Sequence, residues 1–124
     1  MRPSAAISHT RFSASSISSV VYLDTRNRPI AVHEAHVGTC DSSPVHPREV
    51  FGPAVALSVT SVVVAHNHPS GDPTPSAEDK VVTERLRQAG ELLGIKVLDH
   101  LVIGSERFYS FASEGFNVLP GGAR

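Results

Sequence analysis

The 124-residue sequence has little cysteine, little excess charge and no long apolar run. Cys40 is the only cysteine, which excludes an internal disulfide and a multi-cysteine zinc site and suits a reducing cytosol. Eleven basic residues against twelve acidic ones leave a net charge of −1, so nucleic acid is an unfavoured partner. No apolar run approaches the roughly 20 residues that span a bilayer. These absences predict a soluble, cytoplasmic protein without a membrane partner.

Size and composition favour one ordinary globular domain. Hydrophobic residues make up 40% of the chain and charged residues 19%, and a chain of this length can form a real core. We expect the folded domain over residues 20–116 and a flexible tail over residues 117–124. Residues 1–19 are rich in serine and contain no acid, which is typical of a divergent or disordered N-terminal segment or, alternatively, of an organelle transit peptide.

Apolar periodicity predicts an α/β fold with a mixed, twisted sheet. The expected strands are Val20–Leu23, Ile30–Val37, Ser61–Ala65, Ile95–Ile103 and Phe108–Ala112. The first two strands should pair as a hairpin. The β-branched Ser61–Ala65 segment should be a central strand that is buried on both faces.

Two helices should flank the sheet, one on each face. The first begins at Pro47 and should turn five apolar side chains inward: Val50, Phe51, Ala54, Val55 and Leu57. The second covers about Ser76 to Leu93, with an apolar stripe of Val82, Leu86, Ala89 and Leu93. Ser76 with Asp79 fits an N-cap with an acid three positions later, and Gly94 fits the left-handed position past the end.

Two histidines follow the central strand directly. Because residues two apart in an extended segment point to the same side, His66 and His68 can present two imidazoles to one ion. Asp79, in the first turn of the next helix, can reach back as a third ligand. Three ligands of this kind leave the fourth tetrahedral position for water, as in catalytic zinc sites. Ser76 could donate a hydrogen bond to a developing oxyanion, although capping alone explains it equally well.

The whole string from His66 to Asp79, HNHPSGDPTPSAED, resembles the JAMM signature HxHPxGxxxPSxxD at every defined position. Three further segments are similar to the RadC family of JAMM-domain proteins: Pro47–Phe51, Ala65–His68 and Gly94–His100. The resemblance runs from about Val20 to Gly115. It implies a JAMM/MPN fold, zinc on His66, His68 and Asp79, Ser76 as an oxyanion helper, and hydrolysis of peptide or isopeptide amide bonds in a peptide or protein substrate.

One expected residue of the JAMM pattern is missing. JAMM enzymes are expected to carry a glutamate near the first strand as general base. Alignment places Ser16, or alternatively Ser18, at that position. Glu34 or Glu49 could substitute if the fold brings either to the metal, but each is also explained as a surface charge or a first-turn helix acid. RadC proteins also resemble a two-part architecture with a helical region ahead of the JAMM domain, so the N-terminus here is divergent or incomplete.

Three functions therefore stay open: a zinc-dependent metallohydrolase, a zinc-binding but catalytically inactive protein-interaction module, and a DNA-repair-associated protein. The third is suggested by the RadC family label alone, because the sequence has no basic patch. His100 is either a partner of a metal ligand or a hydrogen-bonded strand histidine. The remaining histidines without ligand spacing are interpreted as surface or edge positions: His33, His36 and His46.

Overall fold

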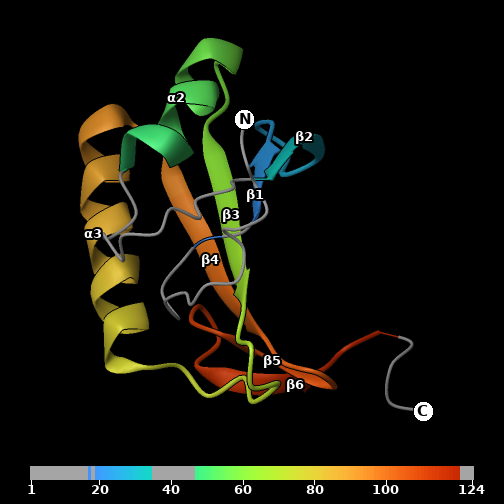
Figure 1. The fold of residues 1–124 in the computed structure, drawn as a ribbon. Coiled ribbons are helices and arrows are strands. Elements are labelled where there is room, and N and C mark those ends of the chain that lie inside the picture. Colours follow the sequence, from blue (N-terminus) through green and yellow to red (C-terminus); the bar gives the residue numbers. More distant parts are fainter. Residues whose placement is uncertain (1–16, 18, 35–46, 121–124) are drawn as a thin grey trace, which may run out of the picture.

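A computed structural model of the protein describes Ile17, residues 19–34 and residues 47–120. Over these residues the strands form one six-stranded sheet in the order β2-β1-β3-β4-β5-β6 (Figure 1). The strands are β1 Ser19–Leu23, β2 Pro29–Glu34, β3 Ser61–Asn67, β4 Lys96–Ile103, β5 Arg107–Ser110 and β6 Gly115–Val118. β3 and β4 are parallel and the other neighbouring pairs are antiparallel. The mixed α/β fold class is confirmed.

The core lies on one face of the sheet. Alternate side chains of a strand share a face, and Val62, Val64 and His66 of β3 are all fully buried. The antiparallel register places Tyr22 of β1 opposite Val62 and Val20 opposite Val64. These β1 side chains therefore point to the same side as His66 and are buried with it.

Both helices, α2 (Pro47–Leu57) and α3 (Ala77–Leu93), cover this same face. The Tyr22 hydroxyl donates a 2.8 Å hydrogen bond to the Val50 carbonyl oxygen of α2. α3 adds Val82 and Leu86 to the same core cluster, and the two helices contact each other (Figure 1). The expectation of one helix on each face is wrong, because periodicity indicates which side of a helix is buried but not which sheet face receives it.

The helix boundaries agree well with the sequence signals, and the inward-facing sets agree less well. α3 begins after Ser76 and ends before Gly94, whose φ of 76° is left-handed. In α2, Val50, Phe51 and Ala54 are buried as expected, but Val55 and Leu57 are 57% and 46% exposed. Val55 lies beside the buried arc, and Leu57 lies in the last turn, where the chain leaves the core. Leu93, expected on the α3 stripe, is also exposed.

The strand prediction is incomplete at the C-terminal end. The strand expected over Phe108–Ala112 ends at Ser110, and a positive φ of 57° at Glu114 turns the chain into β6. The sequence reading missed β6, which carries the sheet two residues past the expected boundary at 116. In the β1–β2 hairpin, residues 35–37 of the expected second strand lie outside the described residues. None of the described helices is both long and apolar enough to cross a membrane.

Candidate metal centre

The three expected ligands meet where β3 ends beneath the start of α3. His66 is the last buried residue of β3, and the backbone N–H of His68 continues the parallel ladder by donating to the Ile103 carbonyl at 3.0 Å. Asp79 projects from the first turn of α3, and both it and His66 are almost wholly inaccessible to solvent. One ligand atom from each of His66, His68 and Asp79 lies within 4.8 Å of the others, so the group could hold a metal ion.

Close backbone packing fixes the loop between His68 and α3. The Gly71 N–H donates to the His68 carbonyl at 2.9 Å, and the Gly71 carbonyl accepts from Ser105 N–H at 2.9 Å. A Cβ on Gly104 would lie only 2.3 Å from Gly71 O and 2.8 Å from Pro73 Cδ, so this approach requires glycine. The loop is thus anchored on the β4–β5 turn, and that anchoring positions the start of α3 relative to His68.

Asp79 is both a helix-capping residue and a charged ligand. Its Oδ2 accepts from the Ser76 backbone N–H at 2.7 Å, and its own N–H donates to Ser76 Oγ at 3.0 Å, which completes a capping box. Burial acts to raise the pKa of Asp79, but the adjoining His66 side chain and the hydrogen bond from the Ser76 N–H together outweigh burial and lower the pKa to about 2. Asp79 is therefore a carboxylate at neutral pH.

The hydrogen bonds of His68 assign its neutral tautomer. Its Nδ1 lies 2.8 Å from the Asp72 carbonyl oxygen, which can only accept, so Nδ1 carries the hydrogen. The Nε2 of the neutral ring then has a lone pair, and it points at Asp79 Oδ2 from 3.0 Å. This contact is a hydrogen bond only if Nε2 carries a hydrogen, and in the neutral tautomer with hydrogen on Nδ1 both facing atoms are acceptors.

A longer hydrogen-bond chain assigns the tautomer of His66. The Thr83 hydroxyl donates to the Asp79 backbone carbonyl at 2.8 Å, so its oxygen accepts from His100 Nδ1 at 2.6 Å. His100 Nε2 must then accept from His66 Nδ1, 2.9 Å away. Burial lowers the pKa of His100 to about 3, which keeps it neutral. In neutral His66 the hydrogen is consequently on Nδ1, and Nε2 carries a lone pair.

The arrangement fits a divalent cation. His66 Nε2 and Asp79 Oδ1 lie 3.0 Å apart, both buried, and over the described part of the chain neither has a hydrogen-bond partner of acceptable geometry. Buried polar atoms without partners are rare, and two facing lone pairs repel each other. A cation bound by both atoms would turn this repulsion into attraction, as it would between His68 Nε2 and Asp79 Oδ2.

The other expected site residues are not all brought to the metal group. Ser76 is half-buried at the start of α3, and its hydroxyl oxygen accepts from Asp79, so the hydroxyl hydrogen remains to donate elsewhere. Ser16 and Ser18 lie outside the described residues. Neither Glu34 nor Glu49 belongs to the candidate metal group found among the described residues.

Geometry explains why these two glutamates are distant from the metal group. Glu34 pairs with Ser19, the residue that also pairs with Ala65. All three lie on the sheet face opposite His66, because strand side chains alternate. Glu49 is exposed in α2, next to Val50, whose contact with Tyr22 places it near the opposite end of β3.

His100 fulfils both interpretations that the sequence left open. It is a buried, hydrogen-bonded strand histidine, and it is also the partner of His66. The sequence reading did not identify Thr83 as part of this group. Its signal was available, because Thr83 follows Asp79 by four residues and so lies on the same face of α3.

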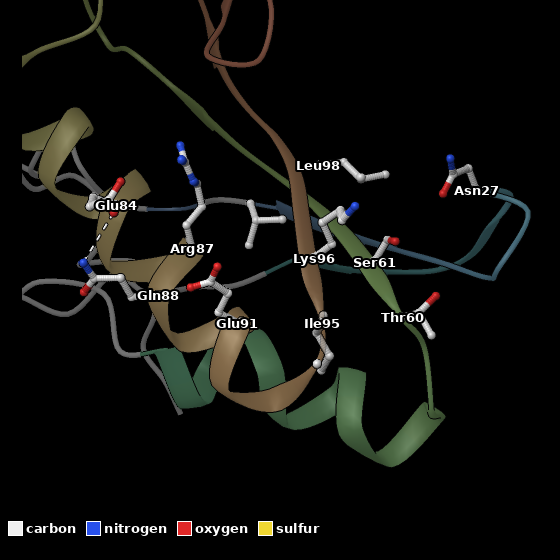
Figure 2. Close-up of a pocket in the computed structure, with 13 residues that line it drawn as sticks. Asn27, Thr60, Ser61, Glu84, Arg87, Gln88, Glu91, Ile95, Lys96 and Leu98 are labelled. Carbon is white, nitrogen blue, oxygen red and sulfur yellow. Dashed lines mark hydrogen bonds between the residues drawn. The ribbon is translucent and has the colours of Figure 1, made fainter.

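A hollow of about 640 Å³ lies at the other end of α3 (Figure 2). Its lining comes mainly from the C-terminal half of α3 and the beginning of β4. Figure 2 shows charged side chains of both signs around it: Glu84, Arg87, Glu91 and Lys96. These four side chains are exposed, and no candidate metal group of the described residues lies there. The chemistry indicated by the residues is therefore at the buried centre and not at this hollow.

Comparison with known proteins supports a family assignment. Residues 5–116 match the family model described as RadC-like JAB domain, which begins earlier than the resemblance expected from about Val20. UPF0758 proteins from Thermotoga maritima and Desulforudis audaxviator are 48% identical over 99 residues and 53% identical over 93 residues, covering 80% and 75% of this chain. A UPF0758 protein from Methanosarcina mazei is 51% identical over 96 residues, covering 77%. The matches cover only 45%, 40% and 42% of these relatives. This chain belongs to the RadC-like JAB domain family.

Proposed function

We propose that the protein is a zinc-dependent hydrolase that cleaves amide bonds in peptide or protein substrates. The observation that carries the proposal is the convergence of two imidazole lone pairs, on His66 and His68, upon the buried Asp79 carboxylate. Two nitrogens and one oxygen are a usual catalytic zinc set, and ligands about 2.0–2.1 Å from a tetrahedral zinc lie about 3.3 Å from each other. In this protein each histidine nitrogen lies 3.0 Å from a different Asp79 oxygen, and the three ligand atoms, one from each residue, lie within 4.8 Å of one another.

Each residue has a distinct role in this proposal. His66 and His68 would bind zinc as neutral ligands, and Asp79 would bind it as a charged ligand that also caps α3. When bound, zinc would supply Lewis acidity to a substrate carbonyl and to a water molecule. The free hydroxyl hydrogen of Ser76 would donate to negative charge that develops on the substrate oxygen.

The second candidate is a zinc-binding module that recognises a protein without cleaving it. Its support is that no glutamate of the described residues joins the metal group, which leaves proton transfer without an evident general base. The matches cover less than half of each relative. A further segment of such proteins could therefore recognise the partner protein or the substrate under either candidate function.

The first experiment measures zinc and hydrolysis together. Purified protein is analysed for metal content and assayed on fluorogenic peptides and an isopeptide-linked peptide, before and after chelation and zinc restoration. We expect one zinc per chain, lost in His66→Ala and Asp79→Ala, with hydrolysis that follows the zinc content. His33→Ala is the matched control, since His33 is exposed on β2. Absence of zinc from the parent protein after zinc is supplied, or hydrolysis that survives His68→Ala, would contradict the proposal.

The second experiment separates hydrolase from binding module. Ser16→Glu and, separately, Ser18→Glu introduce a carboxylate at the two alternative positions that alignment offers for the general base of the JAMM pattern, and the matching glutamine variants introduce the same size without a base. A gain of hydrolysis in the glutamate variant alone supports a hydrolase site that is short of its base. A zinc-loaded parent without activity, and no gain in Ser16→Glu or in Ser18→Glu, would favour the binding module.

A further inference from the structure

We infer that a β-bulge in β4, held by hydrogen bonds to the Asp99 carboxylate, places the His100 ring in hydrogen-bond contact with His66. This contact fixes His66 in the tautomer that can bind metal. Asp99, His100 and Thr83 are then positioning residues of the metal centre. The inference rests on the proposed metal-binding function, and it extends it from the three ligands to the residues that orient one of them.

The bulge decides which face of the sheet His100 occupies. Along β3 and β4, Val62 lies opposite Val97, but Val63 lies opposite Asp99, so Leu98 is the extra residue. Continuing the register without that residue would place Asp99 opposite Val64 and His100 opposite Ala65. A one-residue shift moves every following side chain to the other face. With the bulge, His100 lies opposite Val64, on the face of His66.

The Asp99 carboxylate holds the bulge to the end of β5. Its Oδ1 accepts from the His100 N–H at 2.7 Å and from the Ala112 N–H at 2.9 Å, and its Oδ2 accepts from the Ser110 hydroxyl at 2.6 Å. The Phe111 N–H, between those two residues, donates to the His100 carbonyl at 3.1 Å. The bulge is thereby fixed on both sides of His100.

The His100 ring is fixed as firmly as its backbone. The Phe111 ring stacks on it with centroids 4.9 Å apart and planes 14° apart. Thr83 holds one ring nitrogen from α3, and the other accepts from His66. A ring held in this way can only accept from His66 Nδ1, and the tautomer of His66 with hydrogen on Nε2 would point that hydrogen at the metal position. Partners of metal-bound histidines typically change metal affinity about 10–100-fold when removed.

The test removes one hydrogen bond and restores it. Thr83→Val deletes the hydroxyl with little change of shape, Thr83→Ser keeps it, and Asp99→Ala releases the bulge. Zinc affinity is measured by competition with a chromophoric chelator. The His66 tautomer in the metal-free protein is read from imidazole nitrogen chemical shifts, with circular dichroism to confirm folding.

We expect hydrogen on His66 Nδ1 in the parent protein and loss of that preference in Thr83→Val and Asp99→Ala. Zinc affinity should fall about 10–100-fold in both, and Thr83→Ser should match the parent. Hydrogen on Nε2 in the parent, or folded Thr83→Val with parental affinity and tautomer, would overturn the inference. If Asp99→Ala does not fold, the Thr83 pair still decides. If the parent binds no zinc, the metal proposal fails by itself, and the tautomer shift in Thr83→Val still tests the positioning.

Discussion

The two ends of α3 present opposite kinds of polar surface. At its N-terminal end, Asp79 and His66 are buried and face each other with atoms that lack hydrogen-bond partners among the described residues. At its C-terminal end, a hollow of about 640 Å³ is lined by exposed charged side chains such as Arg87 and Lys96. The hollow is at one end, and the buried polar atoms without hydrogen-bond partners among the described residues are at the other. Function is therefore better inferred from polar atoms that burial has left unpaired than from the size of an opening.

Helix polarity contributes to this difference. The partial positive charge at the N-terminus of α3 stabilises a buried carboxylate there, and Asp79 also satisfies the free N–H of Ser76. The C-terminal end closes through Gly94 and a hydrogen bond from the Ile95 N–H to the Gly90 carbonyl at 2.8 Å. Its polar backbone atoms are satisfied locally, so that end needs no ion.

The largest expected effect comes from Asp79→Ala. Zinc binding should be abolished, because one of three ligands and the only charged one is removed. The metal-free variant should also lose about 0.5–2 kcal/mol of unfolding free energy with the capping box. Metal analysis and urea denaturation measure the two effects. Ser76→Ala is the control, since it should lose similar stability through the cap while keeping zinc. Zinc retained by Asp79→Ala would break the contrast between the two ends.

Acidification of the metal-free protein should have the next largest effect. Burial lowers the pKa of His100 from 6.5 to about 3. Below pH 6.5 His100 is therefore protonated in the unfolded chain, whereas in the folded protein it stays unprotonated down to about pH 3. The free energy of unfolding is therefore unaffected by His100 above pH 6.5. It decreases as the pH falls from 6.5 towards 3, by up to about 1.4 kcal/mol per pH unit.

Urea unfolding in the presence of chelator, from pH 7 to pH 4.5, measures this dependence. His100→Gln should flatten the slope, and His33→Gln, at an exposed position, should leave it unchanged. Equal slopes for the parent and His100→Gln would show that His100 is not the titrating group at the buried end.

Gly90→Ala should destabilise the protein without changing zinc affinity. A Cβ at Gly90 would lie 2.3 Å from the Ile95 carbonyl oxygen and 3.3 Å from Phe51 Cζ, and the first of these is backbone that cannot turn aside. Overpacking of this kind costs about 1–3 kcal/mol. Gly52→Ala is the matched control, because a Cβ there meets nothing within 4 Å and should stabilise α2 by about 0.5–1 kcal/mol. A loss of zinc in Gly90→Ala would show that the two ends of α3 are coupled.

Sequence predicted the features whose signals are local. The N-cap Ser76 and the left-handed Gly94 fixed the α3 boundaries, because capping depends on residues within one turn. The grouping of His66 and His68 was suggested by strand alternation and strengthened by the resemblance of the string from His66 to Asp79 to the JAMM signature. Asp79 was placed by the same cap that begins the helix.

Features that depend on distant contacts were not predicted. The segment that became β4 reads as a strand interrupted by Asp99 and His100, but nothing in it marks Leu98 as an extra residue, because the bulge exists only relative to β3. The face covered by α2 depends on its packing against Tyr22 and α3. β6 is short and gains its stability from pairing with β5, so Gly115–Val118 alone gave no clear pattern.

The smallest expected effect is that of emptying the hollow of charge. Arg87 and Lys96 are both exposed, and substitutions at such positions usually change stability by no more than about 0.5 kcal/mol. The Arg87→Ala, Lys96→Ala double variant should therefore unfold like the parent and bind zinc with the same affinity, as measured by urea denaturation and chelator competition. Single variants provide the control for compensation between the two sites. A clear loss of zinc affinity in the double variant would mean that the charged hollow influences the buried centre through α3, and the separation between the two ends of the helix would have to be abandoned.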